Sequence, residues 1–214
     1  MKVNQSDFNS RWSELHGGAV VEGSIAIWLR ISYWIARTLS TLRISPNAMT
    51  LFGVLLSFSL LTPIIMGDEI ISPYQSLFIL IFALICDGVD GSLAIYQNRV
   101  TAMGALYDSI ADRVAEAFWL TFVVYIGVPA RYAMAIWILG ATQEYARARL
   151  AGLGFSEVGV ITPTERPMRA IYVAVIIALN IFMPGTMTAA SIIFVILQAI
   201  SVLLIAKMAR SLLR

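Results

Sequence analysis

Four aspartates stand at helical spacing in a stretch of the chain that is otherwise largely apolar. Asp87 and Asp90 lie three residues apart, and Asp108 and Asp112 lie four apart beyond a polar break at residues 97–101. Residues three or four apart share a face of an α-helix, so each pair presents both carboxylates on one side. Carboxylate oxygens are ligands that Mg²⁺ and Mn²⁺ prefer, and these ions typically bridge protein carboxylates to substrate phosphates.

The polar break predicts an antiparallel helical hairpin that turns near residue 99. Asp87 and Asp112 stand twelve and thirteen residues from this turn, and Asp90 and Asp108 each stand nine residues from it. At a rise of about 1.5 Å per residue, the members of each mirrored pair lie at matching depth. We therefore expect the four carboxylates to converge in one pocket. Small residues on the same faces would let a ligand approach the backbone: Gly91, Ala94 and Gly104.

Four anions in a low-dielectric site require a counter-charge. Protonation, pairing with arginine and binding of divalent cations can each supply it. Pairing with Arg99 and Arg113 would give the carboxylates a purely structural role. Acids inside a membrane segment are functional by default, and the mirrored register of four strengthens the case for metal.

The composition places the chain in a membrane. Of its 214 residues, 59% are hydrophobic and 13% are charged, and the mean hydropathy is +0.80. A soluble globular chain is nearer to about 45–50% apolar and about 25% charged. The net charge of +2 is too small to indicate a nucleic-acid partner, and the single cysteine excludes an internal disulfide. We expect an all-α integral membrane protein.

Six segments are apolar enough to cross roughly 30 Å of hydrocarbon, which takes about 20 residues. They are residues 47–66, 73–97, 102–126, 131–151, 167–183 and 187–208. The sequence thus predicts six transmembrane helices in a membrane domain of residues 46–214.

Residues 24–42 predict a helix that lies in the membrane interface. Arg30, Tyr33 and Arg37 recur at helical spacing and form one polar stripe, with apolar residues on the opposite face. We expect residues 1–45 to comprise a polar tail and this interfacial amphipathic helix. Within the tail, His16 is expected to be a loop residue rather than a ligand.

Basic residues favour one orientation in the membrane. With six spans and a cytoplasmic N-terminus, Arg131 is the only lysine or arginine in the loops expected outside, as the positive-inside rule requires. A seventh span through residues 24–42 would move the N-terminal basic residues outside. The sequence predicts a multi-pass protein of the cell (plasma) membrane, with both termini and the active site facing the cytoplasm.

The aspartates belong to a longer pattern that resembles the signature of the CDP-alcohol phosphotransferase family (CDP-alcohol phosphatidyltransferases). That signature is D-x2-D-G-x2-A-R-x8-G-x3-D-x3-D. Seven of its positions match here over 26 residues: Asp87, Asp90, Gly91, Ala94, Gly104, Asp108 and Asp112. One position departs, because Ile95 stands where the signature has Arg. The segment from Ser45 to Thr50 resembles the start of the family's first span, so the similarity covers about residues 24–210.

This resemblance implies a metal-dependent transferase of phospholipid biosynthesis. Such an enzyme moves a phosphatidyl-type group from a CDP-linked lipid, such as CDP-diacylglycerol, to an alcohol and releases CMP. The implied ligands of one or two Mg²⁺ or Mn²⁺ ions are Asp87, Asp90, Asp108 and Asp112, and Asp112 is also the implied general base. The implied donor-binding residues are Asn47, Gly91, Ala94, Arg99 and Gly104. A homodimer among membrane lipids is expected from the resemblance alone.

Arg99 is the candidate replacement for the missing signature Arg. It follows Ile95 by one helical turn, so we expect it on the same face and reaching back to the donor phosphates. The alternative is an ordinary arginine that extends its side chain to the membrane interface.

Two basic clusters suit an acceptor that carries phosphate, because guanidinium groups bind phosphate in bidentate fashion. Arg147 and Arg149 end the fourth expected span, and Arg166 and Arg169 begin the fifth. The alternative is that they anchor lipid headgroups. These segments resemble the basic stretches of the phosphatidylinositol-phosphate synthase branch, which implies that all four arginines bind the acceptor phosphate. Glu116 extends the aspartate row by one turn, and we expect it to pair with a buried polar group.

The sequence therefore predicts an enzyme that transfers a phosphatidyl-type group to a polar, phosphorylated alcohol such as inositol phosphate. Glycerol phosphate is the alternative acceptor. A different class is a family member with weakened catalysis that binds CDP-lipid, which the change at Ile95 motivates. An ion or proton transporter is disfavoured, because the acids cluster on one hairpin and are accompanied by arginines suited to phosphate.

Overall fold

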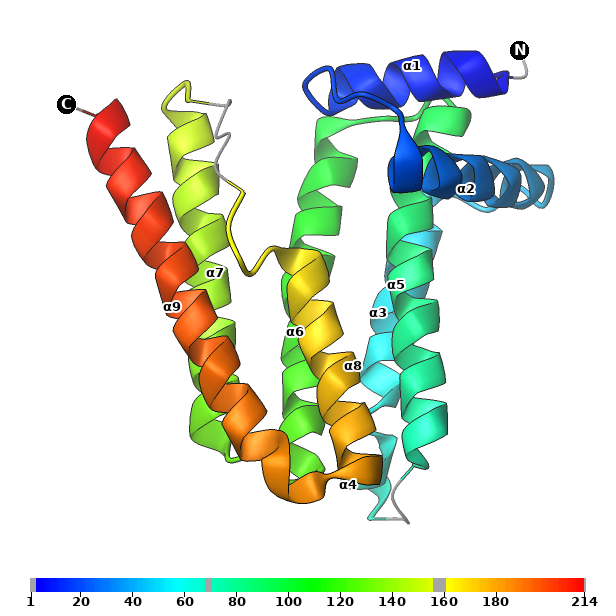
Figure 1. The fold of residues 1–214 in the computed structure, drawn as a ribbon. Helices are drawn as coiled ribbons and strands as arrows, with labels where there is room; N and C mark the ends of the chain where they lie inside the picture. The colour runs from blue at the N-terminus through cyan, green and yellow to red at the C-terminus, as the bar shows by residue number, and fades with distance from the viewer. Residues whose placement is uncertain (1–2, 68–70, 156–160, 214) are drawn as a thin grey trace. The chain divides into compact units, whose positions relative to one another are not determined.

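The computed structural model describes residues 3–67, 71–155 and 161–213, and these form helices and no strands (Figure 1). The elements in chain order are α1 Gln5–Leu15, α2 Gly23–Thr41, α3 Pro46–Ser59, α4 Thr62–Met66, α5 Pro73–Tyr96, α6 Ala102–Tyr125, α7 Ala130–Gly152, α8 Arg166–Phe182, the 3₁₀ turn η1 Pro184–Thr186, and α9 Met187–Leu212. The all-α prediction is confirmed for the described residues.

Local sequence explains where several helices begin and end. Ser45 precedes α3, and its Oγ accepts a hydrogen bond from the backbone N–H of Ala48 at 3.2 Å, as an N-cap does. Proline follows Glu165 within the first turn of α8, where its missing N–H costs nothing. Gly67 ends α4 with a φ of 68°, in the left-handed region that glycine adopts without strain.

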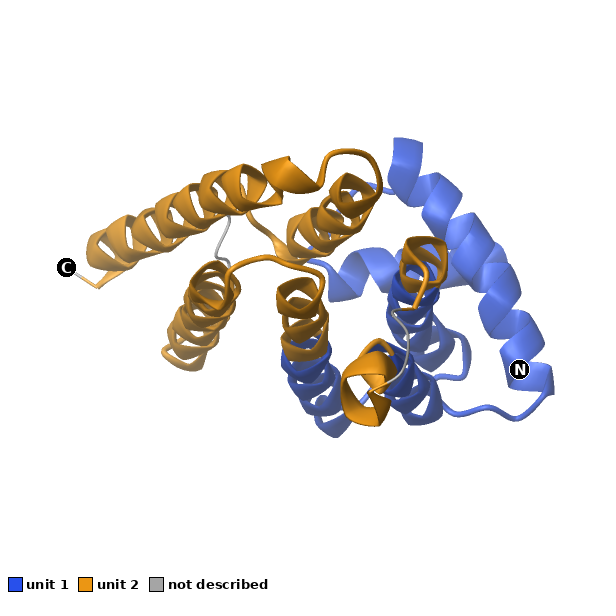
Figure 2. Ribbon diagram, turned by 90° about the horizontal axis from the view of Figure 1, so that it is seen from below, with its two compact units in different colours: residues 1–59, 79–115 blue, residues 60–78, 116–214 orange. Residues whose placement is uncertain are grey.

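Two compact units divide the chain (Figure 2). The first contains residues 1–59 and 79–115, which include α1, α2, α3, most of α5 and the first part of α6. The second contains residues 60–78 and 116–214, which include α4, the rest of α6, α7, α8 and α9. Within the second unit, α7 packs along α9, and α8 also contacts α9. The stacked rings of Tyr172 and Phe194, 4.5 Å apart, join α8 to α9.

Two described helices are long and apolar enough to cross a membrane: α5, and the stretch Pro184–Leu212 that contains α9. Large apolar side chains are exposed along α9, among them Ile193 and Leu203. Such a surface is suited to lipid. The remaining four predicted spans coincide with helices, but the count of six spans stays a prediction. The first of them is not continuous, because α3 ends at Ser59 and α4 begins at Thr62.

The N-terminal tail, which was predicted only as a polar segment, contains the helix α1. Asn4 caps α1 by accepting a hydrogen bond from the backbone N–H of Asp7 at 2.8 Å. Phe8 of α1 is fully buried, and its ring meets that of Tyr33 edge to face at 5.5 Å. These two residues share an apolar cluster with Leu29 of α2 and Ile95 of α5. Phe8, Trp12 and Leu15 recur at helical spacing, but this pattern is too short to predict a helix by itself.

The predicted helix at residues 24–42 is confirmed as α2, and its position in the membrane interface stays a prediction. Arg30 and Arg37 of the predicted polar stripe are exposed, and Ile31 of the predicted apolar face is 49% exposed. Tyr33 departs from the predicted stripe, because it is buried and its hydroxyl donates to the backbone carbonyl of Val3 at 3.1 Å. The docking of α1 explains this difference, because Phe8 packs against the side of α2 that carries Leu29 and Tyr33.

Replacing Phe8 with alanine should detach α1 from the apolar cluster. Removal of a fully buried phenylalanine ring typically costs about 3–5 kcal/mol. We expect a lower unfolding temperature and faster proteolytic cleavage before residue 23, measured on the purified protein. Ile27→Ala, which truncates a side chain that is 64% exposed on α2, is the matched control. Equal effects of the two substitutions would contradict a docked α1.

Candidate functional site

The predicted hairpin of carboxylates is present in the first unit. α5 ends at Tyr96 and α6 begins at Ala102, so the turn lies near residue 99 as expected. Asn98 occupies this turn with a φ of 54°, a conformation that asparagine tolerates better than most residues. The side-chain amide of Gln97 donates to the backbone carbonyl of Ile44 at 2.7 Å. This bond fastens the turn to the segment that precedes α3.

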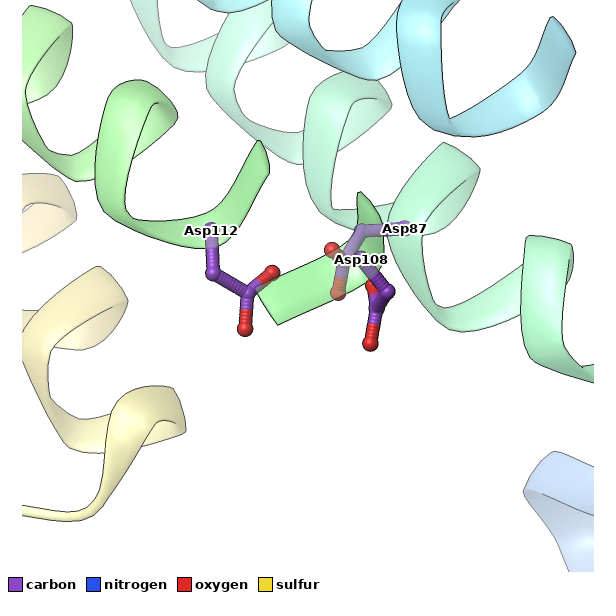
Figure 3. A group of neighbouring side chains, drawn as sticks. All are labelled: Asp87, Asp108 and Asp112. Carbon is purple, nitrogen blue, oxygen red and sulfur yellow. The ribbon is translucent and has the colours of Figure 1, made fainter. Parts of the chain in front are cut away.

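Three of the four aspartates meet between α5 and α6 (Figure 3). One carboxylate oxygen from each of Asp87, Asp108 and Asp112 lies within 4.8 Å of the other two. All three side chains are half-buried, and Arg113 approaches Asp112 at 4.0 Å. The convergence of Asp87 from one helix with Asp112 from the other agrees with the mirrored register.

This oxygen-only set fits a hard divalent cation. Mg²⁺ binds oxygen ligands at about 2.0–2.1 Å, so ligands on opposite sides of the ion are about 4.2 Å apart. The 4.8 Å limit within the aspartate group is only slightly longer, a difference that small side-chain rotations remove. A bound cation would also offset the mutual repulsion of the carboxylates. Asp87, Asp108 and Asp112 are therefore the residues that would hold a metal.

Asp90 does not belong to this group of three. Its side chain is buried, and its carboxylate accepts hydrogen bonds from Thr50 Oγ1 at 2.5 Å and from the backbone N–H of Gly91 at 2.6 Å. The expectation of four convergent carboxylates is thus met by three, with the fourth held against α3. No local pattern indicates Thr50 as a partner of Asp90, because the contact joins residues forty positions apart.

A cavity of about 410 Å³ lies beside the carboxylates in the first unit. Asp90 and Asp108 both line it, so Asp108 belongs to the cavity and to the three-aspartate group. Four of the five residues expected to bind the donor also line it: Gly91, Ala94, Arg99 and Gly104. The fifth, Asn47, is exposed, and a side chain added at Gly104 would come within 3.9 Å of its Oδ1. The volume is within the range of small-molecule sites.

Arg99 reaches the cavity by a route that differs from the expected one. Because α5 ends at Tyr96, Arg99 does not lie on the helical face of Ile95, and the prediction that placed it there was wrong. Arg99 instead lies in the turn, where its backbone N–H donates to the carbonyl of Ala94 at 2.8 Å. Ile95 is 4% exposed and packs in the apolar cluster with Phe8, while it also lines the cavity.

Aromatic residues that the sequence analysis did not assign to the site also line the cavity. They are Trp12 of α1, Trp28 of α2 and His16, which caps the C-terminus of α1. Trp28 lies so close to α5 that a Cβ at Gly88 would be 2.6 Å from its ring. Only glycine permits this approach. Residues this distant in sequence gave no local signal that would place them beside the aspartates.

The basic clusters lie in the second unit, and two of their arginines bind carboxylates there. Arg147 forms a bidentate ion pair with Glu165 at 2.6 and 2.7 Å. Arg169 is buried and donates to Glu116 at 2.8 Å, to Glu144 at 2.9 Å and to the carbonyl of Thr164 at 2.9 Å. Glu116 thus pairs with a buried polar group, as expected.

The other two arginines are more accessible than Arg169. Arg149 is exposed in the last turn of α7, and Arg166 is half-buried at the start of α8. Of the four predicted phosphate ligands, Arg149 is thus the most exposed and Arg169 the most buried.

Glu165 organises the segment before α8. Its Oε1 accepts hydrogen bonds at 2.7 Å from both the backbone N–H and the hydroxyl of Thr162. Burial raises the pKa of Glu165, but the hydrogen bonds from Arg147 and Thr162 outweigh it and lower that pKa to about 2. The carboxylate is therefore ionised at neutral pH and joins Arg147 of α7 to Thr162 in the segment before α8.

Comparisons with known proteins agree with this site. The family described as CDP-alcohol phosphatidyltransferase matches residues 43–206, which leaves α1 and α2 before the matched range. An archaetidylinositol phosphate synthase of Aeropyrum pernix is 30% identical over 153 residues, covering 72% of this chain and 76% of that protein. Another, from Pyrococcus horikoshii, is 29% identical over 136 residues, covering 62% and 70%.

Solved structures show the same fold. A crystal structure of Mycobacterium tuberculosis phosphatidylinositol phosphate synthase with CDP-DAG bound aligns with a TM-score of 0.69 at 21% identity, covering 83% of this chain and 92% of that one. A structure of that protein in complex with manganese and citrate also gives a TM-score of 0.69, at 20% identity, covering 82% and 87%.

Replacing Asp87 or Asp108 with asparagine should weaken divalent-metal binding at least tenfold, because each change removes a charged ligand from the group of three. Titration of Mn²⁺ into the purified protein, followed by electron paramagnetic resonance or calorimetry, measures the affinity. Asp7→Asn, at an exposed position on α1, is the matched control and should bind Mn²⁺ as the unsubstituted protein does. Unchanged Mn²⁺ affinity in both the Asp87 and Asp108 variants would contradict a metal site at this group of aspartates.

Replacing Glu165 with glutamine should destabilise the protein near neutral pH by about 2 kcal/mol, since a carboxylate with a lowered pKa stabilises the fold in its ionised form. Because the folded pKa is about 2 and the ordinary value is 4.5, this stabilisation is present above about pH 4.5 and is lost as the pH falls towards 2. The difference in unfolding temperature between the two proteins should therefore shrink from pH 7 to pH 3. Glu22→Gln, at an exposed glutamate, should show no such trend. A difference that stays constant with pH would contradict this role of Glu165.

Proposed function

The chain belongs to the CDP-alcohol phosphatidyltransferase family, and on that premise we propose that it transfers a phosphatidyl-type group from a CDP-linked lipid to inositol phosphate, releasing CMP. The observation that carries this proposal is that Asp108 belongs both to the three-carboxylate group and to the cavity lined by signature residues. One side chain thus connects the place that suits a cation with the place that suits a nucleotide.

The acceptor hydroxyl attacks the lipid-bearing phosphorus of the donor diphosphate. The new bond joins the acceptor oxygen to that phosphorus, the bond to the bridging oxygen breaks, and CMP leaves with the electron pair. Asp112 accepts the hydroxyl proton as the bond forms. A divalent cation bound by Asp87, Asp108 and Asp112 would neutralise the diphosphate charge and stabilise the leaving group. The manganese complex of the structural relative supports a divalent ion.

The donor is a CDP-lipid, and two observations support this choice. The structural relative was solved with CDP-DAG bound. In this chain, the signature glycines Gly91 and Gly104 line the cavity beside Asp90. A Cβ built at Gly91 meets nothing within 4 Å, so the backbone there is open to a ligand. Ordinary amino acids at that position would fill this space.

Inositol phosphate is the acceptor that the relatives support, because both archaeal proteins are named archaetidylinositol phosphate synthase. In this proposal Arg149 and Arg166 contact the acceptor phosphate directly, because both are more accessible than Arg169. Arg147 and Arg169 hold the surrounding segment in shape, since both guanidinium groups bind carboxylates. The proposed enzyme works in a membrane with its active site facing the cytoplasm, where CDP-lipids and phosphorylated alcohols meet.

Measuring CMP release tests the reaction. Purified protein with Mg²⁺ or Mn²⁺ and CDP-diacylglycerol, or its archaeol counterpart, is incubated with inositol phosphate, inositol, glycerol phosphate or glycerol. We expect metal-dependent CMP release that is fastest with inositol phosphate. Asp112→Asn should slow it at least a hundredfold by removing the proton acceptor, and Asp7→Asn should leave it unchanged.

Two outcomes would contradict the proposal. Faster CMP release with glycerol phosphate would reassign the acceptor and make the enzyme resemble a phosphatidylglycerophosphate synthase. No CMP release with any acceptor, despite metal-dependent nucleotide binding, would show a CDP-lipid-binding protein in which the change at Ile95 has weakened catalysis.

A further inference from the structure

The change at the signature position and the docking of α1 belong to one structural feature. Ile95 stands where the family has Arg, and its side chain is buried in the cluster that receives Phe8 of α1. A guanidinium at position 95 would enter this apolar cluster, where an unpaired charge is costly. The isoleucine therefore permits α1 to dock beside the cavity.

Several contacts within the first unit hold α1 in place. Besides the buried ring of Phe8, Arg11 Nη1 donates to Asn98 Oδ1 in the α5–α6 turn at 3.0 Å. The hydroxyl of Tyr33 donates to the carbonyl of Val3 at 3.1 Å, and Ser13 Oγ donates to the carbonyl of Ala19 at 2.8 Å. A ligand that contacts α1 thus meets a surface that is already ordered, which lowers the entropic cost of binding.

The C-terminal end of α1 supplies an aromatic pair to the cavity. The rings of Trp12 and His16 are stacked, with centroids 4.0 Å apart and planes inclined by 18°, and both residues line the cavity. His16 Nδ1 lies 2.7 Å from the carbonyl of Trp12. Because a carbonyl only accepts, Nδ1 carries the proton, and in the neutral ring Nε2 is left as an acceptor.

We propose that the stacked Trp12 and His16 side chains bind the cytosine base of the CDP-lipid donor. This inference rests on the proposed function and adds a base-recognition site outside the family-matched residues. A planar base stacks on aromatic rings with a favourable free energy of about 1–3 kcal/mol. The phosphates of the same donor are left to Arg99 and to the cation held by the aspartates.

The base is a better occupant than the acceptor alcohol. The cavity that Trp12 and His16 line also contains Thr50, Asp90 and Gly91, and the last two belong to the part of the signature that defines the CDP-dependent family. The arginines proposed for the acceptor phosphate do not line this cavity.

Binding of CMP to the full-length protein in the presence of Mn²⁺ tests the inference by calorimetry. Trp12→Leu keeps an apolar side chain but removes the stacking surface, and it should weaken CMP binding about tenfold. Trp12→Phe keeps a ring and should stay within about threefold of the unsubstituted protein. His16→Ala, which removes one ring of the stacked pair, should weaken CMP binding several-fold. Trp34→Leu, at a tryptophan of α2 that is 56% exposed and outside the cavity, is the control and should bind CMP normally.

Steady-state kinetics separate base recognition from a structural role. Trp12→Leu and His16→Ala should raise the KM for the CDP-lipid and leave the KM for the acceptor unchanged. Unchanged CMP affinity in both variants, or an effect confined to kcat or to the acceptor KM, would overturn the inference while CMP release by the unsubstituted protein upholds the proposed function. Absence of both CMP binding and CMP release in the unsubstituted protein would overturn the two together. If Trp12→Leu fails to fold, His16→Ala, which is outside the apolar cluster, decides the matter.

Discussion

Repulsion among carboxylates is the constraint on which the hairpin of the first unit depends. Asp87, Asp108 and Asp112 bring oxygens within 4.8 Å of one another, where two unit charges repel by about 3–4 kcal/mol at an effective dielectric constant near 20. The scaffold resists this repulsion with bonds from distant segments. Thr50 of α3 binds Asp90, and Gln97 fastens the turn to Ile44. A divalent cation between the aspartates converts the repulsion into attraction, so the same geometry that is costly when empty becomes favourable when a metal is bound.

In the second unit, a buried charge is neutralised by ion pairs between side chains and needs no bound metal. Arg169 is 3% exposed, yet its guanidinium donates to two carboxylates and one backbone carbonyl. A Cβ at Gly140 would lie 3.3 Å from its side chain, so the glycine makes room for it. Removing one partner of a buried ion pair leaves an uncompensated charge, which is strongly destabilising. This arginine is therefore suited to holding α6, α7 and α8 in register, whereas Arg149 is free of such a constraint at an exposed helix end.

The parts of the site that could be predicted are those set by local helical geometry. The spacing of the aspartates and the polar break at residues 97–101 placed Asp87 opposite Asp112, because a regular helix fixes both face and depth. The glycine face of the cavity followed from the same pattern. Arg99 was placed by helical spacing beyond the point where the helix ends, and it reaches the cavity only because the turn redirects it.

The parts that could not be predicted depend on contacts between distant segments. α1 is short and has one fully buried side chain, Phe8, so its sequence pattern does not show what it packs against. Tyr33 of α2 is buried because Phe8 of α1 packs against it. The pairing of Asp90 with Thr50, and of Arg169 with Glu116 and Glu144, links residues 25 to 53 positions apart. Such partners are chosen by the tertiary fold, not by spacing along one helix.

The packing of Ile95 against Phe8 has a consequence for attempts to restore the signature arginine in this chain. A guanidinium introduced at position 95 would have to occupy the apolar cluster formed with Phe8, Leu29 and Tyr33. An unpaired charge is costly there, so the cation could be regained only by displacing α1. In this chain the signature cation and the docked helix therefore exclude one another.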